Sequence, residues 1–215
     1  MNVFVKPNEQ SEACFNSAMA RKGRMKFKIE LIRKGLLYAL FVALLLLIDQ
    51  AIKLWVKNNM CLHESIRITD WFFISYIENN GMAFGMTFIP KYALTLFRLL
   101  ASLYIIYYLG REIYRNARTV WLICLSMILA GAVGNLIDCM FYGIYFHEAP
   151  FMQGRVVDMF YFPLIVSTYP EWFPLWGGEP FIFFSPIFNF ADACISVAVV
   201  MLILFCRQEI EKLRN

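Results

Sequence analysis

The sequence predicts an all-α integral membrane protein, in which a four-transmembrane-helix bundle carries a small extracytoplasmic β-containing lobe. Composition is the first reason: 60% of the 215 residues are hydrophobic and only 17% are charged, against roughly 45–50% and 25% in soluble domains. The second is the presence of four apolar stretches of about membrane-spanning length. The third is the position of the basic residues, most of which flank these stretches on one side. This composition excludes a disordered chain, and a net charge of +4 is too small to suggest nucleic-acid binding.

Each predicted span is close to the length that a helix needs to cross a bilayer. About 20 residues rising 1.5 Å each cover a hydrocarbon core of roughly 30 Å. The predicted spans are residues 35–56, 92–109, 120–137 and 188–206. Two long loops, of about residues 57–91 and 138–187, join the spans in pairs. The membrane domain is therefore expected to cover residues 31–207, followed by a short cytoplasmic tail at 208–215.

The basic residues predict the orientation of the spans. Fourteen of the 20 Lys and Arg residues precede the first span, lie in the short loop between the second and third spans, or follow the fourth. The two long loops hold four. Because cytoplasmic loops carry the excess of Lys and Arg, both termini are expected in the cytoplasm and both long loops outside.

The segments outside the spans also carry predictions. Residues 1–30 are polar and lack periodicity, so a disordered cytoplasmic extension is expected there, and Met25 offers an alternative translation start. Residues 65–77 alternate and contain β-forming side chains, which favours a short strand pair. Residues 161–186 are dense in Pro, Phe and Trp, a composition suited to the membrane–water interface.

Charged residues inside spans are costly and usually functional. Asp49 and Lys53 lie four residues apart near the outer end of the first span, with the acid first. This spacing puts both side chains on one helix face in the favourable order. Two interpretations remain open: a local ion pair that neutralises both charges, or a pair that faces the bundle and orients a site.

Further polar residues are expected at the same membrane depth. Asn135 and Asp138 lie on one face at the end of the third span, where nearby glycines permit close helix approach. Asn189 and Asp192 lie at the start of the fourth span, where a helix N-terminus stabilises a carboxylate. Asp158 is a single acid in an apolar run and would be expensive to bury without a partner.

Two acids close together in apolar surroundings share a proton and titrate as a unit. An aspartic protease needs such a pair: the ionised acid takes a proton from water while the protonated acid hydrogen-bonds the scissile carbonyl. Composition alone does not say which acids pair, and Asp49, Asp138, Asp158 and Asp192 are all candidates.

Other kinds of function are less well supported by the sequence. No metal-binding motif, phosphate loop or serine-hydrolase motif occurs. Intramembrane acids also mark proton relays in transporters, but these acids gather at one level, and neither inverted repeats nor broken helices are visible. A non-catalytic scaffold that binds partners through its aromatic loops is the third possibility.

Five sequence blocks resemble the lipoprotein signal peptidases, also called signal peptidase II. In chain order they are "IDQAIK" (48–53), "NNGMAFG" (79–85), "GAVGNLID" (131–138), "GRVVDMF" (154–160) and "FNFADA" (188–193). Each motif is weak by itself. All five in order, at the predicted membrane depths, identify the chain as a member of this family.

The resemblance implies an activity and assigns residues to it. The family cleaves diacylglyceryl-modified prolipoproteins before the lipidated cysteine in the bacterial cytoplasmic (inner) membrane; it uses no cofactor or metal and is inhibited by globomycin-type peptides. Asp158 and Asp192 are then the catalytic residues. Supporting or substrate-binding residues would be Asp49, Lys53, Asn79, Gly81, Asn135, Asp138, Arg155 and Asn189. The partners would be lipidated substrates and membrane lipid, and the protein is expected to be a monomer.

The sequence departs from the family pattern in three places. Cys139 stands where the family usually has arginine, and Arg155 is a possible substitute. The segment between Asp138 and Asp158 and the loop 161–186 both look extended, either as lids over the site or as elaborations of the surface.

Overall fold

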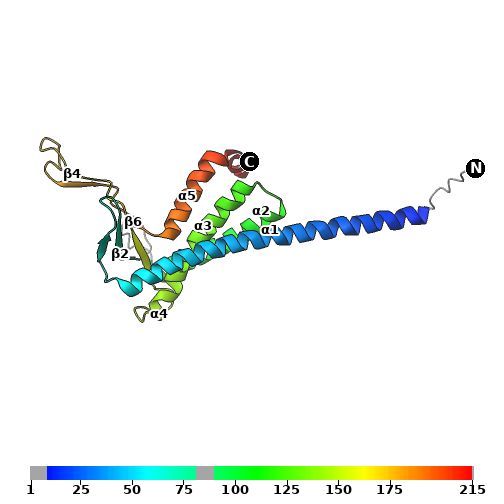
Figure 1. The fold of residues 1–215 in the computed structure, drawn as a ribbon, viewed down its shortest axis with the longest axis horizontal. Helices are drawn as coiled ribbons and strands as arrows, with labels where there is room; N and C mark the ends of the chain where they lie inside the picture. Colours follow the sequence, from blue (N-terminus) through cyan, green and yellow to red (C-terminus); the bar gives the residue numbers. More distant parts are fainter. Residues whose placement is uncertain (1–8, 81–89, 215) are drawn as a thin grey trace, which may run out of the picture.

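The computed structural model describes residues 9–80 and 90–214, and four helices dominate it (Figure 1). They are α1 (Glu9–Asn59), α2 (Lys91–Tyr114), α3 (Thr119–Ile137) and α5 (Phe190–Phe205). Helix α3 packs against each of the other three and forms the centre of the bundle. A π-helical turn, η2 (Asp138–Tyr142), and a short α4 (Gly143–Tyr145) prolong α3, and α6 (Arg207–Arg214) follows α5.

Three helical segments of the described chain are long and apolar enough to cross a membrane. They cover Arg21–Asn59, Lys91–Tyr114 and Thr119–Tyr145, and each contains one predicted span. The fourth apolar helix, α5, has 16 residues and a length of about 24 Å, which is shorter than the hydrocarbon core. A multi-pass membrane protein is therefore confirmed, while a fourth full crossing stays a prediction.

The structure corrects the expectation of a disordered segment before the first span. Residues 9–30, predicted as disordered, belong to α1, which extends well beyond the bundle (Figure 1). No proline interrupts the chain between Pro7 and Pro90, and residues 17–34 are rich in the strong helix formers Ala, Met, Lys and Arg. Helix propensity and continuity with the apolar span outweigh the polar composition here. Residues 1–8 lie outside the described residues.

A β-sheet covers the end of the bundle at which α1 terminates. Its strands are antiparallel in the order β1 (Ser65–Arg67), β2 (Phe73–Asn79), β3 (Val156–Tyr161) and β6 (Ile187–Phe188). The strand pair predicted within residues 65–77 is confirmed, with Ser65 paired to Ser75. The pairing of β2 with β3 joins the two long loops into one lobe.

A second, two-stranded sheet projects from this lobe (Figure 1). It consists of β4 (Ile165–Thr168) and β5 (Pro180–Phe183) and occupies the aromatic loop 161–186. The sequence indicated the interfacial composition of this loop but not its hairpin structure.

Two apolar clusters hold the sheet and the helices together. One lies inside the bundle, around Trp121, Leu122 and Leu129 of α3. The other joins the end of α1 to the sheet through Val56, Val157 and Met159, which are completely buried. The side chains that flank Asp158 in β3 therefore anchor the sheet to α1.

The helices approach closely where the sequence places glycines in α3. A Cβ atom at Gly131 would lie 2.4 Å from the carbonyl oxygen of Ala191. At Gly134 it would lie 2.6 Å from Oδ2 of Asp49. The close approach predicted from these glycines is confirmed, and it brings α1 and the N-terminus of α5 to the same level of α3.

Candidate active site

Asp158 lies on β3 with its side chain almost completely buried. Two asparagines donate to its carboxylate. Nδ2 of Asn189 donates to Oδ1 at 2.6 Å, and Nδ2 of Asn79 donates to Oδ2 at 3.2 Å. Asn79 reaches Asp158 because β2 and β3 are neighbours in the sheet. The partner that a buried acid needs is therefore supplied by two amide groups.

Asp192 occupies the first turn of α5 and is half-buried. Asn189 is the N-cap of this helix, and its Oδ1 accepts a hydrogen bond of 2.9 Å from the backbone amide of Asp192. The carboxylate of Asp192 accepts a further bond of 2.8 Å from Nδ2 of Asn135. A helix N-terminus and an amide donor both stabilise the ionised form of a carboxylate.

Two asparagines connect the aspartates to each other. Asn189 donates both to Asp158 and, at 3.1 Å, to Oδ1 of Asn135. Asn135 in turn donates to Asp192. A continuous hydrogen-bonded chain therefore runs from Asp158 on the sheet to Asp192 on α5, through one residue at the start of α5 and one in α3.

Lys53 supports this chain from within the bundle. Its ammonium group, fully buried, lies 2.9 Å from Asp49 and 2.7 Å from Asp138, and it donates to Oδ1 of Asn135 at 3.0 Å. The two residues form the predicted ion pair, and the pair faces the bundle. That it orients a site stays a prediction. Two buried acidic side chains therefore share one ammonium group, which links α1 to the end of α3.

Asp49 also fixes the position of α5. Its Oδ1 accepts a hydrogen bond of 2.9 Å from the backbone amide of Ala191. This is one of the amide groups that a helix leaves unsatisfied at its N-terminus. The ion pair of α1 is therefore linked directly to the turn that carries Asp192.

Gln50 and Tyr142 belong to the same network, although neither was predicted as a site residue. Nε2 of Gln50 lies 3.1 Å from Asp49 and 3.0 Å from Asp138, and its Oε1 accepts from the hydroxyl of Tyr142 at 3.1 Å. Gln50 was visible as part of the "IDQAIK" block. Tyr142 carried no signal, because its place depends on the π-helical turn after α3.

Burial raises the pKa of Asp158 to about 7, and the neighbouring charge of Asp192 adds to the rise. The hydrogen bonds from Asn79 and Asn189 and the charge of Lys53 act in the opposite direction. A carboxyl group with a pKa near 7 is largely protonated in slightly acidic solution and can donate a hydrogen bond. Its neighbour Asp192 holds the position of an acceptor, so the pair can supply both an acid and a base.

The structure brings together all but two of the residues predicted for the site. Arg155 does not join the network: it is more than half exposed and its Nη1 lies 3.4 Å from Oε2 of Glu78. Gly81 lies outside the described residues. At Cys139, which is completely buried, the guanidinium group of Arg98 from α2 lies 3.0 Å from the sulfur.

A family model described as signal peptidase (SPase) II matches residues 41–207, which include every element of this network. This chain belongs to the signal peptidase II family. Among its relatives, the lipoprotein signal peptidase of Porphyromonas gingivalis is 44% identical over 187 residues, covering 80% of this chain and 83% of the relative. That of Amoebophilus asiaticus is 37% identical over 185 residues and covers 80% and 78%.

Solved structures agree with this fold. One, described as a bacterial membrane enzyme, superposes with a TM-score of 0.59 at 21% identity, covering 81% of this chain and 90% of the other. A second gives a TM-score of 0.56 at 20% identity. The arrangement of helices and strands seen here is thus shared with membrane enzymes. The match to the family model confirms the family predicted from the sequence.

Proposed function

We propose that this protein is an aspartic endopeptidase in which Asp158 and Asp192 are the catalytic residues. The chain is a protease of the signal peptidase II family and processes the signal peptides of lipoproteins. Its substrates are prolipoproteins. The proposal adds the chemistry and the position of the cut, which falls before the diacylglyceryl-modified cysteine.

The hydrogen-bonded chain from Asp158 to Asp192 is the observation that carries this proposal. In the resting pair, Asp158 holds the proton, because it is the more deeply buried and its pKa is near 7. Asp192, in the first turn of α5, then serves as the base. This division of roles matches what general acid–base catalysis requires of two carboxyl groups.

Cleavage then proceeds by direct attack of water on the scissile carbonyl. Asp192 takes a proton from the water as its oxygen bonds to the carbonyl carbon, while Asp158 donates a hydrogen bond to the developing oxyanion. The proton gained by Asp192 passes to the leaving amine as the C–N bond breaks. Asn135 and Asn189 hold the two acids in place, and Asp49, Lys53 and Asp138 fix the helices that carry them.

The sequence and the structure also support a position in the membrane. Both termini would lie in the cytoplasm, following the distribution of Lys and Arg. The site would then lie near the outer leaflet of a bacterial inner membrane, with α5 as the fourth span. A lipidated signal helix would enter sideways from the bilayer, and Asn79 and Gly81 would contact the substrate. Globomycin-type peptides should inhibit a monomeric enzyme without any cofactor.

Arg98 is a better candidate than Arg155 for the role of the family arginine. It reaches the position of Cys139 from a neighbouring helix, whereas Arg155 is paired with Glu78. A guanidinium group at this place would bind carbonyl oxygens of the substrate backbone.

The test is conversion of a lipidated precursor by the purified protein in a bilayer, followed by a gel-shift assay. A matched precursor that lacks the diacylglyceryl group is the control. We expect the mature product from the lipidated precursor only. Equal cleavage of both precursors would contradict the proposed substrate class, and cleavage of neither would contradict the function.

A further inference from the structure

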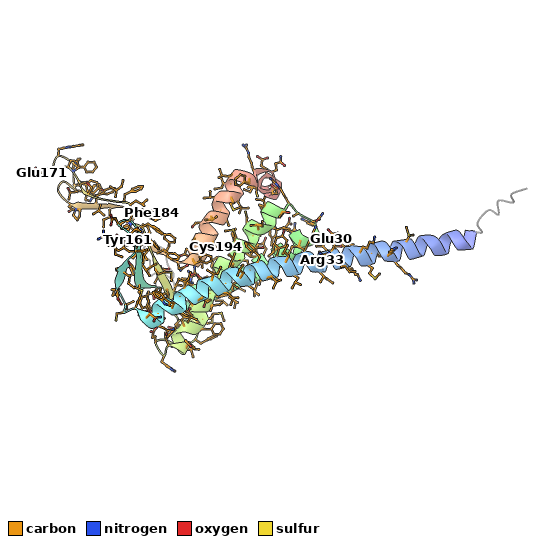
Figure 2. All side chains as sticks on the ribbon, in the orientation of Figure 1. Glu30, Arg33, Tyr161, Glu171, Phe184 and Cys194 are labelled. Atoms are coloured by element: carbon orange, nitrogen blue, oxygen red, sulfur yellow. The ribbon has the colours of Figure 1, made fainter. Side chains whose placement is uncertain are left out.

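The hairpin formed by β4 and β5 exposes apolar side chains outside the helical bundle. It extends sideways from the lobe, crosswise to α3 and α5, as Figure 1 shows. In Figure 2, Glu171 marks its far end and Phe184 lies toward its base, well away from Cys194 on α5. Apolar side chains on the membrane spans are exposed because they face lipid. The hairpin is not part of a span, so its exposed apolar side chains need another explanation.

Both faces of the hairpin are apolar. Ile165 pairs with Phe183 on one face, and Val166 pairs with Ile182 on the other. Their exposed fractions are 54%, 51%, 69% and 40%, respectively. A two-stranded hairpin is at best marginally stable in water. Because both faces of this hairpin are apolar, exposing either face to water is unfavourable. This structure suits an apolar surrounding.

The tip is a preformed aromatic cluster that holds two large side chains outward. Tyr169 stacks on Phe173 at a centroid distance of 5.2 Å, and Phe173 stacks on Trp176 at 6.1 Å. Beyond these rings, Trp172 is 78% exposed and Leu175 is 88% exposed. Leu175 has a φ of 78°, a conformation that is costly for a residue with a side chain. In water, no burial of the leucine side chain would offset this conformational cost.

The charge pattern identifies the kind of surface that would cover the hairpin. The sequence contains no Lys or Arg from residue 156 to residue 206, and the hairpin itself carries only the acids Glu171 and Glu179. Attraction to anionic phosphate groups cannot hold it in place. Contact with the acyl chains and with the boundary below the headgroups requires only apolar and aromatic side chains, which this hairpin has.

We propose that the β4–β5 hairpin docks onto the bilayer in which the bundle is embedded, with Trp172 and Leu175 in the boundary between headgroups and acyl chains. The hairpin extends sideways from the end of the bundle (Figure 1). With the bundle embedded in a bilayer, that direction would run along the leaflet around this end. Among the strands of residues 9–80 and 90–214, none pairs with the outer edges of β4 and β5. These edges need water nearby, which confines the hairpin to the interface and keeps it out of the hydrocarbon core.

Docking would restrain the site as well as the hairpin. At the base, Phe162 stacks on Phe72 of the turn before β2 at 4.7 Å and on Phe188 of β6 at 5.7 Å. Phe188 directly precedes Asn189 in the chain. The base of the hairpin is therefore joined to β6, which directly precedes Asn189, and it directly follows β3, which carries Asp158. The contact of the hairpin with lipid does not depend on the proposed chemistry.

Tryptophan fluorescence of the full-length protein in nanodiscs tests the docking. The difference between the protein and its Trp172→Phe variant isolates the emission of Trp172. In phosphatidylcholine brominated near the upper end of the acyl chains, we expect this emission to fall about twofold or more, because an interfacial tryptophan lies within reach of those carbons. Aqueous iodide should quench it weakly. The matched control is Trp121, which is buried inside the bundle. Its emission is isolated in the same way, with the variant Trp121→Phe.

Three results would overturn the proposal. Quenching of Trp172 by iodide without quenching by bromine would place the hairpin in water. Protection from both quenchers would mean that protein, such as a second copy of the chain, covers it. Quenching that appears only when phosphatidylglycerol replaces phosphatidylcholine would mean that charge, and not apolar contact, holds it. Trp176→Phe repeats the measurement at a second ring.

Discussion

Asn189 and Asp158 lie 31 positions apart in the chain and are joined by a hydrogen bond of 2.6 Å. The asparagine caps α5 and the aspartate belongs to β3, so this bond ties the helical bundle to the sheet. It also favours the ionised form of Asp158 and opposes the effect of burial. One amide group thereby helps to position the proposed acid and acts to lower its pKa.

The first prediction concerns the dependence of cleavage on pH. Asp158 must be protonated to act as the acid, and its pKa is raised to about 7. The protonated form is present below that value and disappears as the pH rises through it. The rate of cleavage should therefore fall across the region around pH 7 toward alkaline solution. A rate that stays constant from pH 6 to pH 9 would assign the proton elsewhere.

The second prediction is that Asn189→Ser moves this alkaline limit to higher pH. Serine is also a good helix N-cap, so α5 should start normally. It is too short to replace the amide that donates to Asp158, and loss of that donor raises the pKa of the acid further. The measurement is the pH–rate profile of the variant beside that of the unchanged protein. A profile that shifts toward lower pH, or does not move, would contradict the assigned role of Asn189.

The third prediction is a large loss of stability in Lys53→Met. The substitution leaves the carboxylates of Asp49 and Asp138 buried without their cation, a change that costs about 3–5 kcal/mol in comparable buried pairs. Thermal unfolding in detergent measures it. The variant that also carries Asp49→Asn and Asp138→Asn should recover most of the loss, whereas equal instability of both variants would show that packing of the lysine stem matters more than its charge.

The fourth prediction compares two glycines. Gly131→Ala would drive a methyl group against the backbone of Ala191, next to Asp192, whereas a methyl group at Gly110 would meet no atom of the described residues within 4 Å. We expect Gly131→Ala to lose about 1–3 kcal/mol and to reduce cleavage by displacing α5. Gly110→Ala should be neutral or slightly stabilising. Similar behaviour of the two variants in unfolding and activity assays would argue against close packing of α3 on α5.

The fifth prediction separates the two arginines. Arg98→Met should raise the KM for the lipidated precursor about tenfold, equivalent to about 1.4 kcal/mol, because it removes the guanidinium group beside Cys139. Arg155→Ala should change it little, since Arg155 is exposed and paired with Glu78. Steady-state kinetics of both variants decide between them. The reverse order of effects would restore Arg155 as the substitute.

The membrane segments and the polar residues of the site could be predicted from the sequence. The third predicted span, 120–137, nearly coincides with α3, because its hydropathy is high and its ends are polar. Asp49, Asn135 and Asp192 were selected because charged and amide groups are rare and costly inside apolar segments. The free-energy cost of a polar group in an apolar segment can be recognised from the sequence alone.

The contacts between distant segments could not be predicted in this way. Asp158 appeared as an acid in an apolar run, and its place on a sheet beside Asn79 depends on the pairing of strands from two different loops. Tyr142 reaches Gln50 only through the π-helical turn. The helical conformation of residues 9–30 was missed because polar composition was given more weight than helix propensity.

The most direct test of the proposed chemistry is the turnover of lipidated precursor by Asp158→Asn and by Asp192→Asn, measured beside the unchanged protein at equal amounts of folded enzyme. Asparagine keeps the shape of each side chain but can neither donate an acidic proton nor accept one from water. Each variant should lose about 10²–10⁴-fold in rate while its unfolding temperature stays close to that of the unchanged protein. Turnover within a few-fold of the unchanged protein in either variant would contradict the shared role of Asp158 and Asp192.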